Sequence, residues 1–267
     1  MLIDATHIAF RYGETDILTD ISFSMDPGEI LCLLGPNGCG KTTLLDCLLG
    51  ILKPLKGQII VKGEDVKTWR PGRLARHIAY VPQGHEETFP YTVFEMTLMG
   101  RAPYISMFAS PSREDKAIAN DVIDQVGIAR FRNRPYTQLS GGEKQLVLIA
   151  RALAQQTPLI IMDEPTAHLD FRHEFVVLET MMRLSRDHNI SIIMATHFPN
   201  HAFYFQSQAI PTRAAMLHNG QFISMGQPDT VLTAARIRQL YGIDAQVVEF
   251  DRNGTLQKNV IPVKTLV

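Results

Sequence analysis

A glycine-rich run that ends in a lysine and two threonines spans Gly35 to Thr43, and its composition suits the binding of phosphate groups. It follows the apolar segment Ile30 to Leu34, so the pattern predicts a buried strand, a phosphate-binding loop and then a helix. Glycines let backbone N–H groups turn inward around phosphates, Lys41 adds a point charge, and Thr42 offers a hydroxyl to Mg²⁺. The loop positions expected to contact a bound nucleotide are Asn37, Gly38, Cys39, Gly40, Lys41, Thr42 and Thr43.

Two carboxylates, Asp163 and Glu164, come directly after a second apolar segment, Leu159 to Met162. Open α/β sheets bind their ligands at the carboxyl ends of the strands, so both acids are predicted to face the phosphate loop. Asp163 is expected to hold Mg²⁺ through water or Thr42, and Glu164 to polarise the water that attacks the terminal phosphate. The alternative is a pair of acids that only caps a surface strand, which the matching loop upstream disfavours.

A further anion site is indicated at Ser140-Gly141-Gly142, which precedes a helix predicted over Glu143 to Ala154. Unpaired N–H groups and the positive end of the helix dipole meet at such an end, and two glycines let a phosphate approach the backbone. Taken alone, this tripeptide would be an ordinary helix cap. Its position between the phosphate loop and the acidic pair favours the anion site.

A histidine, His197, follows the predicted core strand Ser191 to Ala195, at the same sheet edge as the two acids. We interpret it as a contact of the terminal phosphate that keeps Glu164 and the attacking water in line. His201 lies one helical turn further along the chain, which raises the alternative of a metal-binding histidine pair. Pro199 stands between the two histidines and argues against one continuous helical face, so the metal reading is disfavoured.

Charge and cysteine content limit the classes of protein. The chain has 267 residues and a formal net charge of −1 without a long basic stripe, which argues against nucleic-acid binding. Three cysteines without paired spacing predict neither a metal site nor a disulfide scaffold and fit a reduced, cytosolic setting, with Cys39 a small filler rather than a redox switch. No run of about 18 apolar residues is present, so work at a membrane is expected to pass through a partner.

Hydrophobic periodicity predicts the remaining elements of an α/β fold. Strands are predicted over Leu2 to Tyr12, Ile17 to Met25, Gly57 to Lys62 and Ile78 to Val81. A helical pattern runs from Thr92 to Gln138, with a loop predicted over Gly100 to Pro111. Hairpins are predicted over Ala214 to Met225 and Val247 to Val263, with one or two short helices over Pro228 to Tyr241. The arginines between Trp69 and His77 are interpreted as a solvated helix face.

Together these motifs closely resemble the ATP-binding subunits of ATP-binding-cassette (ABC) transporters, over residues 1 to 240. The resemblance implies that Tyr12 stacks on adenine, that Gln83 forms the Q-loop, and that Asp170 ends the D-loop. The signature, Leu139 to Glu143, ends in glutamate where glutamine is commoner. The residues implied in catalysis are Lys41, Gln83, Glu164 and His197; those implied in Mg²⁺ binding are Thr42, Gln83 and Asp163; and Ser140, Gly141, Gly142, Asp170 and His197 join the loop, Tyr12 and Gln83 in the ATP site.

The same resemblance implies a fold and a set of partners. The expected fold is a P-loop NTPase core of the ABC ATPase type with an antiparallel β subdomain, in a single domain over residues 1–267. A helical subdomain over about residues 88–155 would be inserted in the core, and a short tail would span about residues 243–267. Two copies are expected to pair head to tail around two ATP molecules. A membrane permease is expected to dock near Gln83 to Tyr104, at the cytoplasmic face of the inner membrane, and to work with a substrate-binding protein.

A finer resemblance concerns the transported compound. The segments Thr92 to Glu95, Met99 to Tyr104, Asp163 to Asp170 and His197 to Ala202 are similar to those of importers of iron-siderophore, haem and cobalamin, with a molybdate or tungstate branch. One alternative is a soluble ABC ATPase of iron–sulfur cluster assembly, which lacks a loop of the Gly100 to Tyr104 type. A mechanical ATPase on DNA or ribosomes would show heptad arms, tandem cassettes or basic extensions, and an exporter ATPase usually comes fused to its membrane spans.

Overall fold

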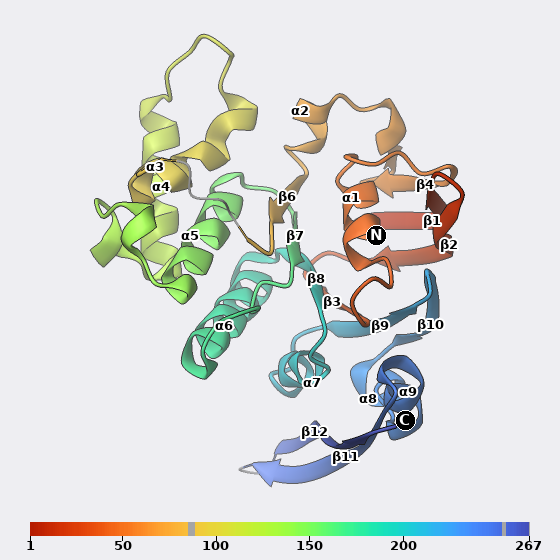
Figure 1. Ribbon diagram of the computed structural model, residues 1–267. Helices are drawn as coiled ribbons and strands as arrows, with labels where there is room; N and C mark the ends of the chain where they lie inside the picture. The colour runs from red at the N-terminus through yellow and green to blue at the C-terminus, as the bar shows by residue number, and fades with distance from the viewer. Residues whose placement is uncertain (85–88, 253–254, 267) are drawn as a thin grey trace.

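The computed structural model describes residues 1–84, 89–252 and 255–266, and a six-stranded sheet forms its centre (Figure 1). The strand order is β10-β9-β3-β8-β7-β6, in which β6, β7, β8, β3 and β9 run parallel and β10 pairs antiparallel with β9. The strands are β3 (Ile30–Leu34), β6 (Ile78–Val81), β7 (Leu159–Asp163), β8 (Ser191–Thr196), β9 (Thr212–His218) and β10 (Gln221–Gly226). Their shared direction places the carboxyl ends of β3, β7 and β8 at one edge.

Both faces of this sheet are covered, which explains the continuous apolar runs in its strands. Every residue of β3, β7 and β8 is buried. Within β3, Cys32 belongs to one hydrophobic core and its neighbours Leu31 and Leu33 belong to the core on the opposite face. The helices around the sheet include α1 (Lys41–Leu48), α5 (Gly141–Ala154), α6 (Phe171–His188) and α7 (Asn200–Ser207).

An antiparallel sheet of order β2-β1-β4-β5 lies beside the central sheet (Figure 1). Its strands are β1 (Ile3–Tyr12), β2 (Thr15–Met25), β4 (Lys56–Val61) and β5 (Glu64–Asp65). They are followed by the short helices η1 (Val66–Thr68) and α2 (Pro71–Leu74). The predicted helix at the arginine-bearing stretch is therefore a single turn. Its Arg73 pairs with Glu64 at 2.7 Å and lies over the Trp69 ring, so this arginine is engaged within the subdomain.

Helices dominate the segment from β6 to β7. They are α3 (Val93–Leu98), η2 (Met99–Tyr104), α4 (Arg113–Val126), η3 (Ala129–Phe131), η4 (Tyr136–Gln138) and α5. The prediction of a loop from Gly100 onward was wrong for Gly100 to Tyr104, which form most of the 3₁₀-helix η2. Gly100 is buried so close to α5 that a Cβ atom there would lie 2.0 Å from the carbonyl oxygen of Arg151.

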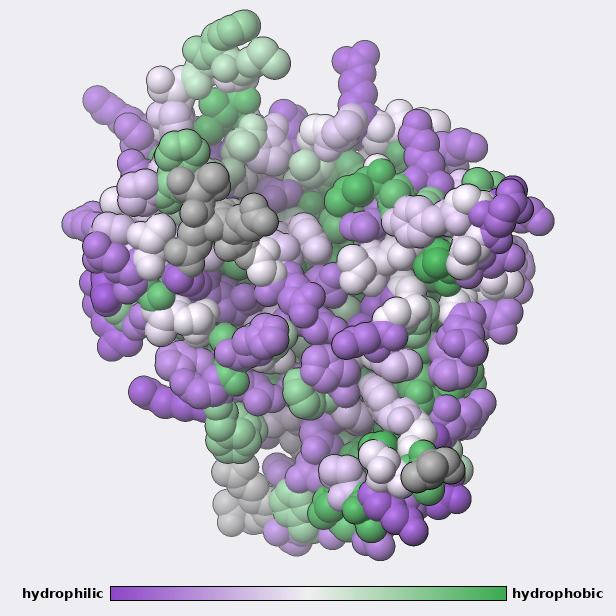
Figure 2. Space-filling model, in the orientation of Figure 1, coloured by the Kyte–Doolittle hydropathy of each residue, from purple (hydrophilic) through white to green (hydrophobic). Residues whose placement is uncertain are grey.

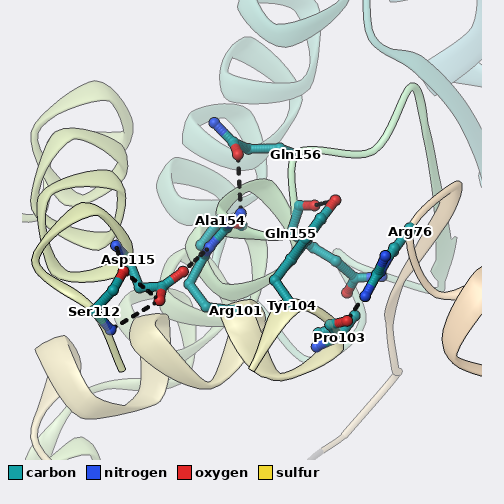
Figure 3. Close-up of polar contacts among 9 residues, drawn as sticks. All are labelled: Arg76, Arg101, Pro103, Tyr104, Ser112, Asp115, Ala154, Gln155 and Gln156. Carbon is teal, nitrogen blue, oxygen red and sulfur yellow. Dashed lines mark hydrogen bonds and ion pairs between the residues drawn. The ribbon is translucent and has the colours of Figure 1, made fainter. Parts of the chain in front are cut away.

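Arg101 fastens η2 in place, as Figure 3 shows. Its guanidinium Nε donates to Asp115 Oδ1 at 3.0 Å, and Nη1 donates to the carbonyl of Ala154 and to Gln156 Oε1, both at 2.9 Å. Arg101 is buried, so these bonds replace the water that a guanidinium would otherwise require. The arginine thus ties η2 both to the first turn of α4 and to the end of α5.

The C-terminal part contains the elements that the sequence predicts. These are the β9–β10 hairpin, the helices α8 (Pro228–Val231) and α9 (Ala234–Tyr241), and a hairpin of β11 (Ile243–Arg252) and β12 (Thr255–Thr265). Asn219 and Gly220 have φ of 47° and 74°, which suits the predicted type I′ turn. The predicted turn at residues 253–254 lies outside the described residues. Among the helices that the structure describes, none is long and apolar enough to cross a membrane.

Candidate nucleotide-binding site

The phosphate loop joins β3 to α1, and two of its glycines, Gly38 and Gly40, adopt left-handed backbone conformations. Gly38 has φ 78° and Gly40 has φ 107°, values that favour glycine over any other residue. Helix α1 has no acidic residue in its own first turn. Lys41 is 6% exposed, and its Nζ donates to the carbonyls of Gly35 at 2.7 Å and Pro36 at 3.1 Å. The loop therefore curls around its own lysine.

Thr42 and Asp163 connect the start of α1 with the end of β7. The Thr42 hydroxyl donates to Asp163 Oδ2 at 2.9 Å. Asp163 is buried, and this burial raises the pKa of its carboxyl although the hydrogen bond from Thr42 opposes the shift. Asp46 lies one turn further along α1, where burial and the charge of Asp163 raise its pKa as well.

A hydroxyl and a buried carboxylate are hard oxygen ligands, of the kind that Mg²⁺ takes together with phosphate oxygens and water. Across residues 1–84, 89–252 and 255–266 there is no cluster of three or more His, Cys, Asp or Glu side chains that could hold a metal by itself. The donors that are present therefore fit a Mg²⁺ ion shared between protein and nucleotide. They do not fit a structural metal centre.

Glu164 lies at the centre of the predicted catalytic set. Its backbone takes the left-handed φ of 47°, and its side chain is 11% exposed. Gln83 Nε2 donates to Glu164 Oε2 at 3.0 Å. Glu164 Oε1 lies 3.8 Å from Lys41 Nζ and 3.4 Å from His197 Nδ1. The structure thus gathers the other three residues predicted for catalysis, Lys41, Gln83 and His197, around the Glu164 carboxylate.

The His197 ring approaches the Glu164 carboxylate without a hydrogen bond between them. His197 Nδ1 is buried and lacks a hydrogen-bond partner, although Glu164 Oε1 lies 3.4 Å away. A buried, unpaired ring nitrogen costs free energy unless a further group satisfies it. The His197 side chain as a whole is 37% exposed, so the ring can contact a group that enters the site beside Glu164.

The signature residues make their contacts elsewhere. Ser140 caps α5, and Glu143 completes a capping box in which its Oε2 accepts from the Ser140 N–H at 2.9 Å. Gly142 lies against α6, where a Cβ atom would come within 2.3 Å of the His173 ring. These described contacts join Ser140 and Gly142 to their own neighbours and not to the phosphate loop.

Two further predicted residues also lie apart from Glu164. Tyr12 ends β1, is 53% exposed, and packs edge to face on Phe10 with 4.9 Å between ring centroids. Asp170 caps α6, where it accepts from the His173 N–H at 2.9 Å and pairs with His173 Nδ1 at 2.7 Å. These hydrogen bonds hold the pKa of Asp170 below its usual value. The exposed face of Tyr12 is available for stacking.

Cys39 packs inside the phosphate loop, next to Gly35. It is 6% exposed, and burial raises the pKa of its thiol despite the nearby charge of Lys41. A thiol with a raised pKa is largely protonated at neutral pH and therefore unreactive. This environment suits the predicted filler role.

Three residues of the site were missed by the sequence reasoning. Asp46 adjoins Asp163, while His173 and Glu174 lie in the first turn of α6, where they contact Gly142 and His201. Asp46 follows Thr42 by one helical turn, a spacing that could have pointed to the same helix face. His173 and Glu174 follow Asp170, a predicted residue of the ATP site, by three and four residues, which is the equivalent signal.

Comparisons with known proteins identify the class. The sequence model of the ABC transporter family matches residues 18–167. The chain belongs to this family, and it is the ATP-binding subunit, an ATPase, of an ABC transporter.

Relatives match along nearly the whole chain. It is 38% identical to an uncharacterized ABC transporter ATP-binding protein of Haemophilus influenzae over 97% of both chains. It is 35% identical to the molybdate import ATP-binding protein MolC of the same organism, over 90% of this chain and 87% of that one. It is 34% identical to the iron(3+)-hydroxamate import ATP-binding protein FhuC of Bacillus subtilis, over 92% and 90%.

A solved structure agrees with these relatives. An inward-facing transporter assigned to the metal-chelate type of ABC transporter matches with a TM-score of 0.86 and 31% identity, over 98% of this chain and 97% of the other. The expected ABC ATPase fold, with its antiparallel β subdomain, is therefore confirmed.

Proposed function

We propose that this chain powers the import of a metal chelate (an iron-siderophore, haem or cobalamin) or of molybdate or tungstate, through a separate membrane permease. The observation that carries the ATPase part is the convergence of Lys41, Gln83 and His197 on Glu164, beside the Thr42–Asp163 pair. Support for the transported compound comes from relatives that import molybdate, iron(3+)-hydroxamate and hemin, which match 90–99% of this chain.

The roles of the catalytic side chains follow from these positions. Glu164 polarises the water that attacks the terminal phosphate, and the partly exposed ring of His197 contacts that phosphate. Lys41 exchanges the carbonyls of Gly35 and Pro36 for phosphate oxygens when ATP enters. Mg²⁺, held by Thr42, Asp163 and Gln83, would neutralise charge that develops on the phosphates.

Two copies of the chain are proposed to close head to tail around ATP. The helix end at Ser140-Gly141-Gly142 binds phosphate in this proposal, and within its own chain its contacts are with Glu143 and His173. The half-exposed Tyr12 of the first copy would stack on the adenine of the bound ATP. A single copy should therefore hydrolyse ATP poorly.

An apolar groove supports the docking of a permease. It has a volume of about 570 Å³ and lies between α1, α2 and η2, with a lining that includes Leu49 to Leu55, Trp69, Leu74, Met99 and Gly100. Figure 2 shows apolar side chains gathered in the hollow between α1 and α2. The groove overlaps the expected docking range of Gln83 to Tyr104 at Met99 and Gly100 and extends it to Leu49 to Leu55. Such a groove suits a short amphipathic helix of the partner.

This docking would place the chain at the cytoplasmic face of the inner membrane. A substrate-binding protein would then act on the far side of the permease without touching this chain. The alternative function is that of a soluble ABC ATPase on an iron–sulfur assembly scaffold. The η2 segment and its groove favour the permease-bound form.

The test is to purify the tagged chain from detergent-solubilised native membranes with ATP and vanadate and to identify its partners by mass spectrometry. We expect a permease with many membrane spans in a one-to-one ratio. Ile51→Arg, at a 64% exposed groove residue, should lose this partner. The matched control Leu256→Arg, at a 62% exposed residue of β12, should keep it. A soluble scaffold with no membrane protein would contradict the importer and support the alternative.

A further inference from the structure

His201 does not pair with His197 as a metal ligand. It belongs to a network of hydrogen bonds that includes Thr196 and Phe198, the two residues next to His197 in the sequence. It lies in the first turn of α7 and is 3% exposed. Its Nε2 lies 2.6 Å from Glu174 Oε1, and its Nδ1 lies 3.1 Å from the hydroxyl of Thr196. Both ring nitrogens therefore have partners in the protein, and neither is available as a ligand.

The donors and acceptors of this hydrogen-bond network indicate which atoms carry its protons. The Thr196 hydroxyl oxygen accepts from the N–H of Phe198 at 3.1 Å, so its own hydrogen is free to point at His201 Nδ1. In the tautomer that carries its proton on Nε2, the His201 ring accepts at Nδ1 from Thr196 and donates at Nε2 to Glu174. Each member is then satisfied, and the order of bonds runs from Phe198 through Thr196 and His201 to Glu174.

The hydrogen-bond network holds the turn that contains His197. Thr196 ends β8 and Phe198 follows His197, so the hydrogen bond between them spans the residue that lies 3.4 Å from Glu164. The Phe198 ring packs against the rings on both sides, with centroids 4.3 Å from His197 and 5.4 Å from His201. A change in the hydrogen bonds of His201 would therefore move His197 relative to Glu164.

The last residue of the hydrogen-bond network, Glu174, lies in the first turn of α6, which also contacts the signature. Glu174 follows Asp170, the cap of α6, and neighbours His173, whose ring blocks any Cβ at Gly142. One helical turn thus contacts the signature helix through His173 and the His197 turn through Glu174.

We propose that Glu174 and His201 are positioning residues for ATP hydrolysis. They hold the Thr196–Phe198 turn so that His197 faces the terminal phosphate beside Glu164, and they tie this turn to the helix that follows the D-loop. The inference rests on the role given to His197 in the proposed function. It predicts a loss of turnover without a loss of nucleotide binding.

Thr196→Val and Glu174→Leu test this proposal in the full-length chain. Thr196→Val is nearly isosteric and removes only the hydroxyl, so folding should survive. Steady-state ATPase rates and direct ATP titrations are measured for both variants. Because small displacements of a reacting group are costly, we expect kcat to fall by about tenfold or more while the ATP affinity stays within about twofold. Glu174→Gln should retain the rate, since its amide oxygen still accepts from His201 Nε2.

The matched control is Thr212→Val. Thr212 is also buried and also lies in the central sheet, at the opposite end of the strands. Its hydroxyl donates one hydrogen bond, to the carbonyl of Ile210 instead of to a histidine ring. Its kcat should be that of the wild type. An equal loss of kcat in Thr212→Val, or a parallel loss of ATP affinity in Thr196→Val, would assign the effect to packing and overturn the proposal.

His197→Ala, assayed alongside, distinguishes a failure of the positioning role from a failure of the proposed function. If His197→Ala is inactive while Thr196→Val and Glu174→Leu turn over normally, the positioning role is wrong and the proposed function stands. If His197→Ala hydrolyses ATP at the wild-type rate, the role of His197 in the proposed function is wrong, and the positioning role falls with it.

Discussion

At Gly100, η2 packs so closely against α5 that there is no room for a side chain. A Cβ atom at this position would lie 2.0 Å from the carbonyl oxygen of Arg151 and 3.0 Å from the Cβ of Ala154. Ordinary contact begins at 3.4 Å, and the obstructing oxygen is backbone, so the helix itself would have to move. Gly100→Ala should therefore separate η2 from the end of α5.

Overpacking of this kind costs about 1–3 kcal/mol of unfolding free energy. For a chain of this size each kcal/mol corresponds to about 2–4 °C in Tm, so Gly100→Ala should lower Tm by about 2–12 °C. Calorimetry or a denaturant midpoint measures the change. Gly100 also lines the groove proposed for the permease, so the variant should retain less permease in the native-membrane purification while still binding ATP.

Gly72→Ala is the matched control. Gly72 lies in α2 with no heavy atom within 4 Å of the added Cβ, and its φ is outside the left-handed region. This variant should equal the wild type or gain up to about 1 kcal/mol from the stiffer unfolded chain. If Gly100→Ala proved as stable as Gly72→Ala, the packing of η2 on α5 described here would be refuted.

Three further predictions concern the nucleotide site. Lys41→Ala should weaken ATP binding, since it removes the charge that faces the phosphates; an unchanged affinity in a titration would count against that role. Burial raises the pKa of Asp163 above its usual 3.8, so its contribution to stability is present at acid pH and is lost as the pH rises through the raised pKa. In EDTA, Asp163→Asn should therefore unfold at a higher temperature than the wild type at pH 7, and the difference should shrink towards pH 4; a constant difference would contradict this. Cys32, Cys39 and Cys47 are buried with raised thiol pKa values, about 12 for Cys32 and Cys47, so all three should resist alkylation at pH 7 in the folded chain, and rapid labelling would contradict their burial.

The elements that could be predicted from the sequence are those determined by neighbouring residues. Ile30 to Leu34 is a continuous apolar run, and all five residues are buried in β3. The acids after Leu159 to Met162 reached the expected sheet edge because all parallel strands end there. The turn at Asn219 and Gly220 was predictable from the residue types that tolerate positive φ.

Features that depend on distant partners could not be predicted in the same way. The burial of Arg101 rests on Asp115 and on Ala154, 53 residues further along the chain, so η2 read as a loop. The role proposed for Glu174 depends on its contact with His201, 27 residues away, and nothing in the local spacing indicates that pairing. Gln83 and Glu164, 81 residues apart, were linked only through the family resemblance.

In the proposed function, ATP is enclosed between the phosphate loop of one copy and the signature of another, and Glu164 completes hydrolysis. Glu164→Gln should bind ATP but not hydrolyse it, so light scattering after gel filtration should show a dimer with ATP and Mg²⁺ and a monomer without them. Adding Gly141→Asp, where the nearest atom to the new Cβ is 3.8 Å away, should leave ATP binding intact and abolish the dimer, because it places a negative charge against the phosphates. A Glu164→Gln chain that stays monomeric at saturating ATP would contradict the account.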